Sequence, residues 1–330
     1  MDPVTHTAVG FAIAQAGAKK LTKNWAWVMF LAASAPDVDV LFFFPWNINV
    51  LDWHRHFTHA PLFSPLLAAA VVIGAKYVLR REIEVRGAFL LALIGILAHH
   101  LVDMLTYRGT RLFLPFSDEQ FGLKIESFFD PVLYLIFVLG FAAPFLSNLV
   151  NGEIGARRGS GALAAWLMLI SASGWIWVRH SFKEQALAEL SSRIYEGAAP
   201  RRVDVMPTYH PVRFLAYVEG DQFQKLLDVD LLDYFDPEAG QTLYKQVPSV
   251  AAGKALRIAA TTRSAQVFLA WARWPRTMVT RLDGETRWVV VIEEMLVEKH
   301  RSRPRLIVKL DENYAIQSEE YERSKSTTGF

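Results

Sequence analysis

The chain contains no cysteine among its 330 residues. This absence excludes disulfide bonds, thiolate metal sites and cysteine nucleophiles. A metal site in this protein must therefore be built from histidine, aspartate and glutamate. Those donors suit zinc, manganese or iron, so the sequence predicts that any bound metal is a divalent ion of this kind, with zinc as the first expectation.

A strong excess of one charge is also missing. The 35 lysines and arginines nearly balance the 33 aspartates and glutamates, and no basic helix with interleaved aromatics occurs, so no nucleic-acid partner is expected. The sequence has no HExxH, which excludes a zincin-type site, and it has no GxSxG or P-loop. Its N-terminus lacks a basic region and an evident cleavage site, so the first apolar segment is expected to remain in the mature protein.

Long apolar runs are abundant instead. Hydrophobic residues make up 52% of the chain, and the mean hydropathy of +0.19 is rare for a soluble domain. We expect a mainly α-helical, multi-span membrane bundle of about five or six apolar helices over residues 1–180. The first run is short for a span, which usually needs roughly 20 residues. The runs are 7–18, 25–44, 61–79, 88–106, 129–150 and 162–178.

The composition changes near residue 181, where charges become frequent and long apolar runs end. We predict a connecting amphipathic helix within 181–199 and a soluble α+β domain over 200–330. Enrichment in β-branched and aromatic residues is typical of strands. The expected elements of this domain are strands at 212–218, 223–232, 286–293 and 305–310 and one helix at 250–273.

Titratable residues cluster beside these apolar runs. The loop after the second run reads HRHFTH, from His54 to His59, and Asp37 and Asp39 follow Pro36 closely. Each pattern has an ordinary alternative, namely a solvated turn for the aspartates and a patch that binds lipid headgroups for the loop. Inside an apolar span, however, ionisable groups are usually functional.

A second pair lies within the fourth run, where His99 and Asp103 are four residues apart and share one helix face. A histidine bonded to a carboxylate for purely structural reasons is the alternative. The clusters all fall at one predicted membrane face, and together they exceed the ligands that one metal needs, which fits a two-metal site. The candidate metal ligands are His6, Asp37, Asp39, His54, His59, His99 and Asp103. No role is assigned to His56, His100 or Asp130.

In this order the motifs resemble the YdjM-like family of membrane-bound metal-dependent hydrolases. That family has a histidine near the N-terminus, then PDxD, HRGxTHS and HxxxDxxT, and the resemblance covers about residues 1–145. Residues 207–232 are weakly similar to a C-terminal extension of some members. The chain departs at two positions, with His56 where glycine is usual and Ala60 where serine is usual.

The resemblance implies an integral-membrane hydrolase that acts on a phosphoester or related bond of a lipid. Metal-activated water would be the nucleophile, Asp39 a ligand or the base, and Arg55 the group that stabilises charge on the substrate. The alternative is a non-enzymatic membrane module with a structural metal site and a partner-binding soluble domain. A transporter is disfavoured because the polar residues lie at the ends of the runs.

The distribution of basic residues predicts the orientation in a bacterial-type inner membrane. Loops 19–24, 80–87 and 151–161 carry eight lysines and arginines, whereas loops 45–60 and 107–128 carry four. Cytoplasmic loops usually hold the excess of positive charge. The metal site and the C-terminal domain are therefore expected to be extracytoplasmic.

A reporter enzyme fused after Gly329 tests this orientation. We expect a periplasmic phosphatase reporter to be active and a cytoplasmic fluorescent reporter to be dark at this position, because both follow the side on which the C-terminus lies. The opposite pair of results would invert the predicted topology.

Overall fold

The computed structural model describes residues 1–43, 48, 51, 55–153, 161–245, 249–282, 288–296 and 303–324. The chain forms two compact units. One comprises Met1–Asp39 and Arg55–Leu243, and the other comprises Val40–His54 and Tyr244–Phe330. His54, one of the predicted metal ligands, lies outside the described residues.

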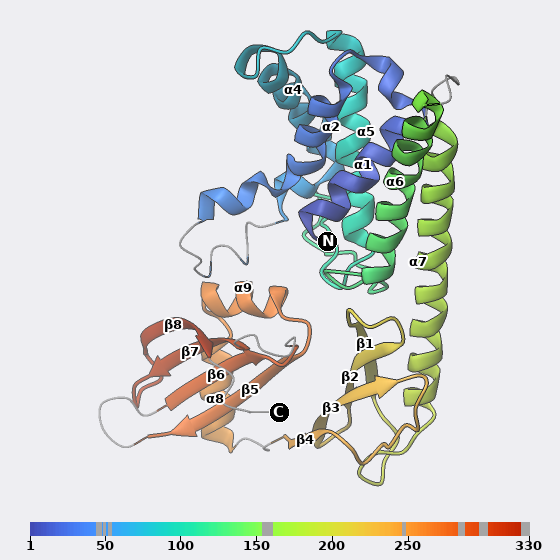
Figure 1. The fold of residues 1–330 in the computed structure, drawn as a ribbon. Coiled ribbons are helices and arrows are strands. Elements are labelled where there is room, and N and C mark those ends of the chain that lie inside the picture. Colours follow the sequence, from blue (N-terminus) through green and yellow to red (C-terminus); the bar gives the residue numbers. More distant parts are fainter. Residues whose placement is uncertain are drawn as a thin grey trace. The chain divides into compact units, whose positions relative to one another are not determined.

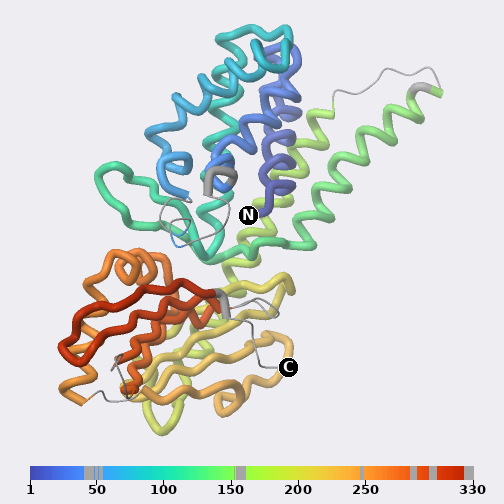
Figure 2. The backbone as a smooth tube through the Cα atoms, turned by 90° about the vertical axis from the view of Figure 1, so that its left-hand side faces the viewer, coloured from blue at the N-terminus to red at the C-terminus, as the bar shows by residue number. Residues whose placement is uncertain are grey.

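The N-terminal half is helical (Figure 1). In this half, α5 packs against α1, α2 and α4, while α7 packs against α1 and α6. A view from the side shows the same bundle (Figure 2). The helices are α1 (Pro3–Ala16), α2 (Trp25–Ser34), α4 (Ser64–Ile73), α5 (Val85–Met104), α6 (Pro131–Glu153) and α7 (Ala162–Ser191). Shorter 3₁₀ helices are η1 (Ala18–Leu21), η2 (Pro36–Phe43), η3 (Phe57–His59) and η4 (Pro61–Phe63), and η5 (Gly74–Val78) is a π-helical segment.

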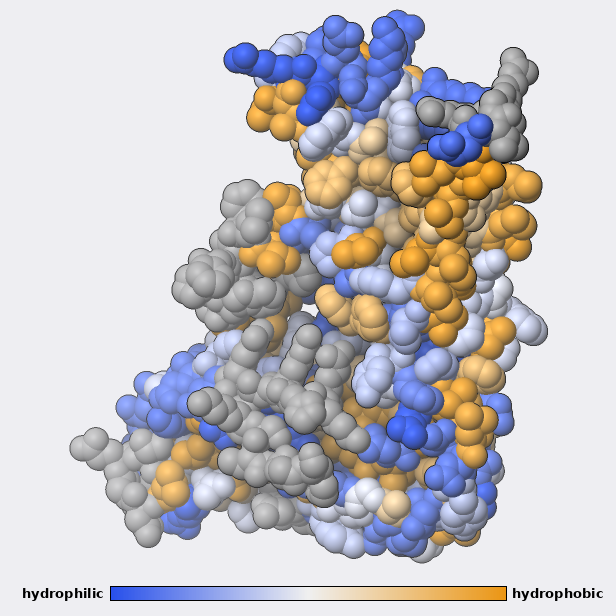
Figure 3. Space-filling view, in the orientation of Figure 1, coloured by the Kyte–Doolittle hydropathy of each residue, from blue (hydrophilic) through white to orange (hydrophobic). Residues whose placement is uncertain are grey.

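Four stretches in the described part of the chain are long and apolar enough to cross a membrane: Pro61–Val78, Val85–Met104, Pro131–Asn151 and Ala162–Ser191. The expected number of five or six is not confirmed. The second apolar run is divided because Pro36, which cannot continue a helix, separates α2 from η2. Apolar residues cover much of the visible surface of α6 and α7 in Figure 3.

Small residues bring three helices together around Met29. A Cβ added to Gly10 of α1 would lie 2.9 Å from the Met29 sulfur, and one added to Gly95 of α5 would lie 2.8 Å from it. The missing side chains therefore let α1 and α5 approach α2 closely, as small residues do between membrane helices. This packing holds together the three helices that carry or flank the predicted metal ligands.

Within the described residues, the region after residue 200 forms two antiparallel four-stranded sheets, with strand orders β1-β2-β3-β4 and β5-β6-β7-β8. An overall mainly α fold is thus not confirmed, because the C-terminal region is rich in strands. The strands are β1 (Arg202–Pro207), β2 (Arg213–Glu219), β3 (Phe223–Asp230), β4 (Gln241–Tyr244), β5 (Pro275–Arg281), β6 (Trp288–Glu294), β7 (Arg303–Leu310) and β8 (Ile316–Ser324).

The four strands expected from the sequence correspond to β2, β3, β6 and β7. Two helical expectations take a different form. The helix expected over 250–273 is two helices, α8 (Val250–Ala259) and α9 (Arg263–Trp271), because the Thr262 hydroxyl caps a new helix. The residues expected to form a separate helix from 183 continue α7 without a break as far as Ser191.

Each sheet has its own apolar core. Alternate residues of β6 and β7, including Val290 and Val308, pack with Ala255 of α8 and Phe268 of α9. The first sheet instead packs on the C-terminal part of α7 through a cluster that includes Ala186, Leu190, Phe214 and Val218. The long helix α7 therefore belongs both to the helical bundle and to the core of the first sheet.

A buried ionic cluster lies where α7 meets this sheet. The Arg179 guanidinium, which is fully buried, donates hydrogen bonds to the carbonyls of Thr208, His210 and Pro211. Its Nε atom lies 3.7 Å from carboxylate oxygens of both Glu126 and Asp130. Burial, followed by the nearby charge of Asp130, raises the pKa of Glu126 to about 9. Glu126 is thus neutral near pH 7 and leaves Arg179 paired with Asp130.

The raised pKa of Glu126 predicts a pH-dependent stability. Because the folded protein holds this proton and the unfolded chain releases it above about pH 4.5, stability should fall as the pH rises towards 9. Glu126→Gln removes the titration. Thermal unfolding in detergent should show a loss of at least about 1.4 kcal/mol over this window in the wild type that is absent in the variant. Glu119→Gln, an exposed change in the same loop, should keep the wild-type profile.

Candidate metal centre

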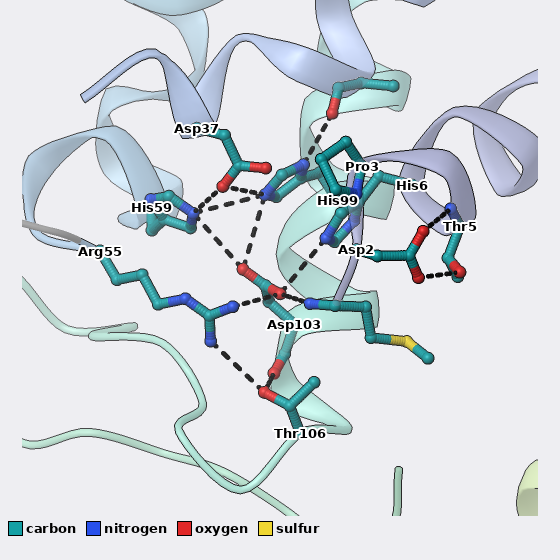
Figure 4. Close-up of polar contacts among 12 residues, drawn as sticks. Asp2, Pro3, Thr5, His6, Asp37, Arg55, His59, His99, Asp103 and Thr106 are labelled. Carbon is teal, nitrogen blue, oxygen red and sulfur yellow. Dashed lines mark hydrogen bonds and ion pairs between the residues drawn. The ribbon is translucent and has the colours of Figure 1, made fainter. Parts of the chain in front are cut away.

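Four side chains converge on one point between α2, α5 and the loop that contains η3 (Figure 4). The donor atoms are Oδ1 of Asp37, Nε2 of His59, Nε2 of His99 and Oδ2 of Asp103, and all lie within 4.8 Å of one another. The His59 nitrogen is 3.3 Å from Asp37, 3.4 Å from Asp103 and 3.3 Å from the His99 nitrogen. The His99 nitrogen is 3.7 Å from Asp37 and 3.5 Å from Asp103.

These separations fit a tetrahedral metal site. A tetrahedron with metal–ligand bonds of about 2.0–2.1 Å has edges of about 3.3–3.4 Å. Five of the six edges of this set measure 3.3–3.7 Å. Two imidazole nitrogens and two carboxylates are donors that zinc accepts. The cluster can therefore hold a divalent metal ion with little rearrangement.

Neighbouring groups fix the tautomers of both histidines. Nδ1 of His99 lies 2.7 Å from the carbonyl oxygen of Ala33, which can only accept, so Nδ1 carries the proton. The Thr58 hydroxyl donates to Asp39, so it accepts from Nδ1 of His59 at 3.0 Å. In both rings the Nε2 lone pair is then directed at the centre, as metal coordination requires.

The electrostatics of the centre favour a cation. Burial alone would raise the pKa of Asp37, but the hydrogen bond from His59 and the charge of the nearby imidazoles hold it below its usual range. Burial likewise opposes a charged His59, yet Asp103 and Asp37 together raise its pKa. A proton on His59 and a bound metal would therefore compete for the same place, and metal binding should release that proton.

The other oxygen of Asp103 faces a second group of polar residues. His6 Nε2 is 3.3 Å from Oδ1 of Asp103, and the His6 ring stacks on His99 at a centroid distance of 3.7 Å. Burial lowers the pKa of His6 to about 4, so its imidazole is neutral and offers a lone pair. The α-amino group of Met1 lies 2.5 Å from the same oxygen. Oδ2 of Asp103 thus faces the tetrahedral cluster, and Oδ1 faces His6.

Arg55 closes the loop side of the centre. Its guanidinium donates to Oδ1 of Asp103 at 2.9 Å, to the Thr106 hydroxyl and to the Gly109 carbonyl. Its backbone N–H donates to Asp39 at 3.0 Å. Arg55 adopts a left-handed backbone conformation with φ of 60°, which costs free energy in a residue other than glycine. Contacts with both Asp39 and Asp103 compensate for this strain.

Comparison with known proteins places this chain in a family. The sequence profile of the family described as YdjM inner membrane protein matches residues 1–185, more than half of the chain. The chain belongs to the YdjM inner membrane protein family. YfhP of Bacillus subtilis (strain 168), described as uncharacterized, is 26% identical over 143 residues, which cover 41% of this chain and 43% of that protein. The chain thus matches less than half of the length of this relative. No solved structure matches the chain.

The YdjM family match covers all the residues predicted for the site, and the structure brings most of them together. His6, Asp37, His59, His99 and Asp103 meet within the helical half. Asp39 lies beside them, with Oδ2 accepting from Arg55 and Thr58 and 3.7 Å from Nδ1 of His59. His54 is outside the described residues, so its part as a ligand stays a prediction.

Residues without an assigned role lie at the edge of the centre or away from it. His100 contacts the Thr58 carbonyl at 3.2 Å, and His56 lies 3.7 Å from Asp118. Asp130 does not join the centre. It caps α6 by accepting from the backbone of Val132 and Leu133.

Several groups of this site were not singled out from the sequence. The Ala33 carbonyl orients His99, and Thr58 orients His59. Thr58 and Thr106 were part of the family motifs, and that was the only signal for them. Nothing in a sequence marks a particular backbone carbonyl as the partner of an imidazole 66 residues away.

Removal of the carboxylate at the centre tests the assignment. Asp103→Ala should lose bound metal, because Asp103 is one of the four donors and also contacts His6 and Arg55. Inductively coupled plasma mass spectrometry on the purified protein should find the metal content reduced at least about tenfold relative to wild type. Asp118→Ala, which removes an exposed carboxylate of the next loop, should retain it. A folded Asp103→Ala protein with its full metal content would overturn the assignment.

Proposed function

We propose that this protein is an integral-membrane, metal-dependent hydrolase that cleaves a phosphoester or a related bond of a lipid with metal-activated water. The observation that carries the proposal is the one-sided opening of the centre. The side chains of His59, His99 and Asp103 are fully buried, whereas that of Asp37 is 25% exposed. A substrate can therefore approach the donor set from the side of Asp37.

Arg55 supplies the second element that phosphoester cleavage needs. Its side chain is 12% exposed and lies next to the donor set. Its Nε–H is buried and has no acceptor among the residues that the structure describes. An oxygen of a phosphoryl group would satisfy this donor, and arginine binds such oxygens well. Arg55 would then stabilise the charge that develops on the phosphoryl oxygens in the transition state.

The metal, for which we propose zinc, would lower the pKa of a bound water to near 7. Asp37, His59, His99 and Asp103 would hold it. Asp103 also presents Oδ1 to His6, so a carboxylate bridge to a second ion is compatible with the arrangement. Asp39 orients His59 through Thr58, and its predicted role as a ligand or base remains a proposal. We also propose that the centre faces the extracytoplasmic side, as the charges of the loops indicate.

A structural metal site is the second candidate. Four protein donors at tetrahedral spacing fill the usual coordination sphere of zinc, and closed sites of this kind are structural. In that case the ion would tie η2, α5 and the η3 loop together, and the C-terminal region would bind a partner. The two functions differ in whether the ion reaches water and substrate.

Turnover by the metal-loaded, full-length protein separates the candidates. The protein is incubated with vesicles of phosphatidylethanolamine and phosphatidylglycerol, and the released headgroups and phosphate are measured by mass spectrometry. Arg55→Gln should keep its metal and lose at least about a hundredfold in kcat, because one donor to the transition state is removed. Arg108→Gln, whose parent side chain stacks on Tyr107, should keep wild-type turnover.

Cobalt substitution tests independently whether the metal site is open to substrate or closed. An open site should change its visible absorption spectrum when inorganic phosphate is added, because phosphate would enter the coordination sphere. The structural alternative would be established by three results together. Cobalt would be bound tetrahedrally, its absorption spectrum would not change when phosphate is added, and the protein would hydrolyse neither lipid.

A further inference from the structure

A pocket at the other end of the helical bundle combines polar and apolar walls. It has a volume of about 270 Å³ and lies between the end of α1, the second half of α6 and the start of α7. His6 is near the start of α1 and Gln15 near its end, so the pocket and the metal centre lie at opposite ends of this helix. Its lining residues are Gln15, Lys19, Gly140, Phe141, Pro144, Phe145, Asn148, Gly161, Ala165 and Met168.

The polar side of the pocket offers both donors and an acceptor. Lys19 supplies a positive charge, and its Nζ lies 2.7 Å from the side-chain oxygen of Gln15. Asn148 adds an amide on α6. Pro144 lies inside α6 and has no N–H, so the Gly140 carbonyl loses the helix hydrogen bond that residue 144 would otherwise donate. An oxygen acceptor that is short of a donor is costly in an apolar environment.

The apolar side continues onto the outer surface of α6. Phe141, Pro144 and Phe145 line the pocket, and Phe145 is 66% exposed. The neighbouring Leu146 and Leu149 are also exposed on this helix, which is long and apolar enough to cross a membrane. In Figure 3 the apolar surface of α6 and α7 ends at a hydrophilic cap. A ligand in this pocket would therefore contact polar groups at one end and hydrocarbon at the other.

We propose that this pocket binds the headgroup of an anionic phospholipid. The phosphate would pair with Lys19, a headgroup hydroxyl would donate to the Gly140 carbonyl, and the acyl chains would lie along Phe145 and the outer face of α6. Basic pockets between membrane helices bind anionic headgroups by this combination of charge and depth. A water-soluble phosphate ester would use the polar half but would leave the adjoining apolar surface without a partner.

The ligand is tested on delipidated, full-length protein in a neutral detergent. Phosphatidylglycerol or phosphatidylcholine is added, and native mass spectrometry counts the lipids that remain bound. We expect phosphatidylglycerol to be retained over phosphatidylcholine. Lys19→Gln should reduce its retention about fivefold, since one lysine at a membrane surface contributes about this factor. Lys20→Gln should not reduce it, because that lysine is exposed and does not line the pocket.

Two further measurements separate loss of the Lys19 charge from loss of fold, and lipid binding from phosphate binding. Lys19→Arg preserves the charge and should retain phosphatidylglycerol, which separates loss of charge from loss of fold. Inorganic phosphate, added without lipid, should change the unfolding temperature of the wild type and of Lys19→Gln equally, because phosphate bound at the metal centre does not contact Lys19. Equal retention in the two glutamine variants, equal binding of the two lipids, or a stabilisation by free phosphate that Lys19→Gln removes would each overturn the proposal.

Discussion

The structure of the helical half depends on keeping a buried carboxylate paired. The side chain of Asp103 has no exposed surface, yet it comes from a helix that is apolar enough to cross a membrane. An ionised carboxylate in such a place is stable only if opposite charges and hydrogen-bond donors surround it. His6, His59, His99 and Arg55 do so, and they come from three separate segments of the chain. Pairing of this one group therefore fixes how α1, the η3 loop and α5 meet.

A second buried charge links the bundle to the first sheet by the same rule. Arg179 lies midway along α7 and is neutralised from the loop that precedes α6, while its remaining donors bind carbonyls between β1 and β2. Breaking one partner of a buried pair leaves an uncompensated charge, which is strongly destabilising. The ionic cluster therefore fixes the position of α7 against the first sheet, and the apolar contacts of Ala186 and Leu190 complete the packing.

The two ends of the bundle differ in chemistry, which suits a protein of the YdjM inner membrane family. One end carries the His/Asp centre and Arg55, where a metal and an anionic group can be bound. The other carries Lys19, together with a pocket open towards an apolar surface. We propose that a phospholipid is relevant at both ends, as substrate at the first and as bound membrane lipid at the second.

The sequence by itself determined the residue types and order of the site. Absence of cysteine restricted the ligands, and the spacing of His99 and Asp103 placed both on one helix face. Local patterns of this kind do not depend on the tertiary structure. The predicted number of five or six spans was not confirmed, and the strands β1, β4, β5 and β8 were not predicted. Short apolar helices resemble spans in a hydropathy pattern, and polar strands such as β8 are stabilised by pairing with a neighbour.

Only the tertiary structure decided which candidate residues share the centre. His59 and His99 are 40 residues apart, and the 3.3 Å between their nitrogens results from the way in which the η3 loop meets α5. The packing of α2 on α5 brought the Ala33 carbonyl to His99, and the separate packing of α6 on α7 brought Asp130 to Arg179. Contacts between residues far apart in sequence depend on helix approach and on backbone groups that every residue possesses, and for that reason the sequence pattern does not specify them.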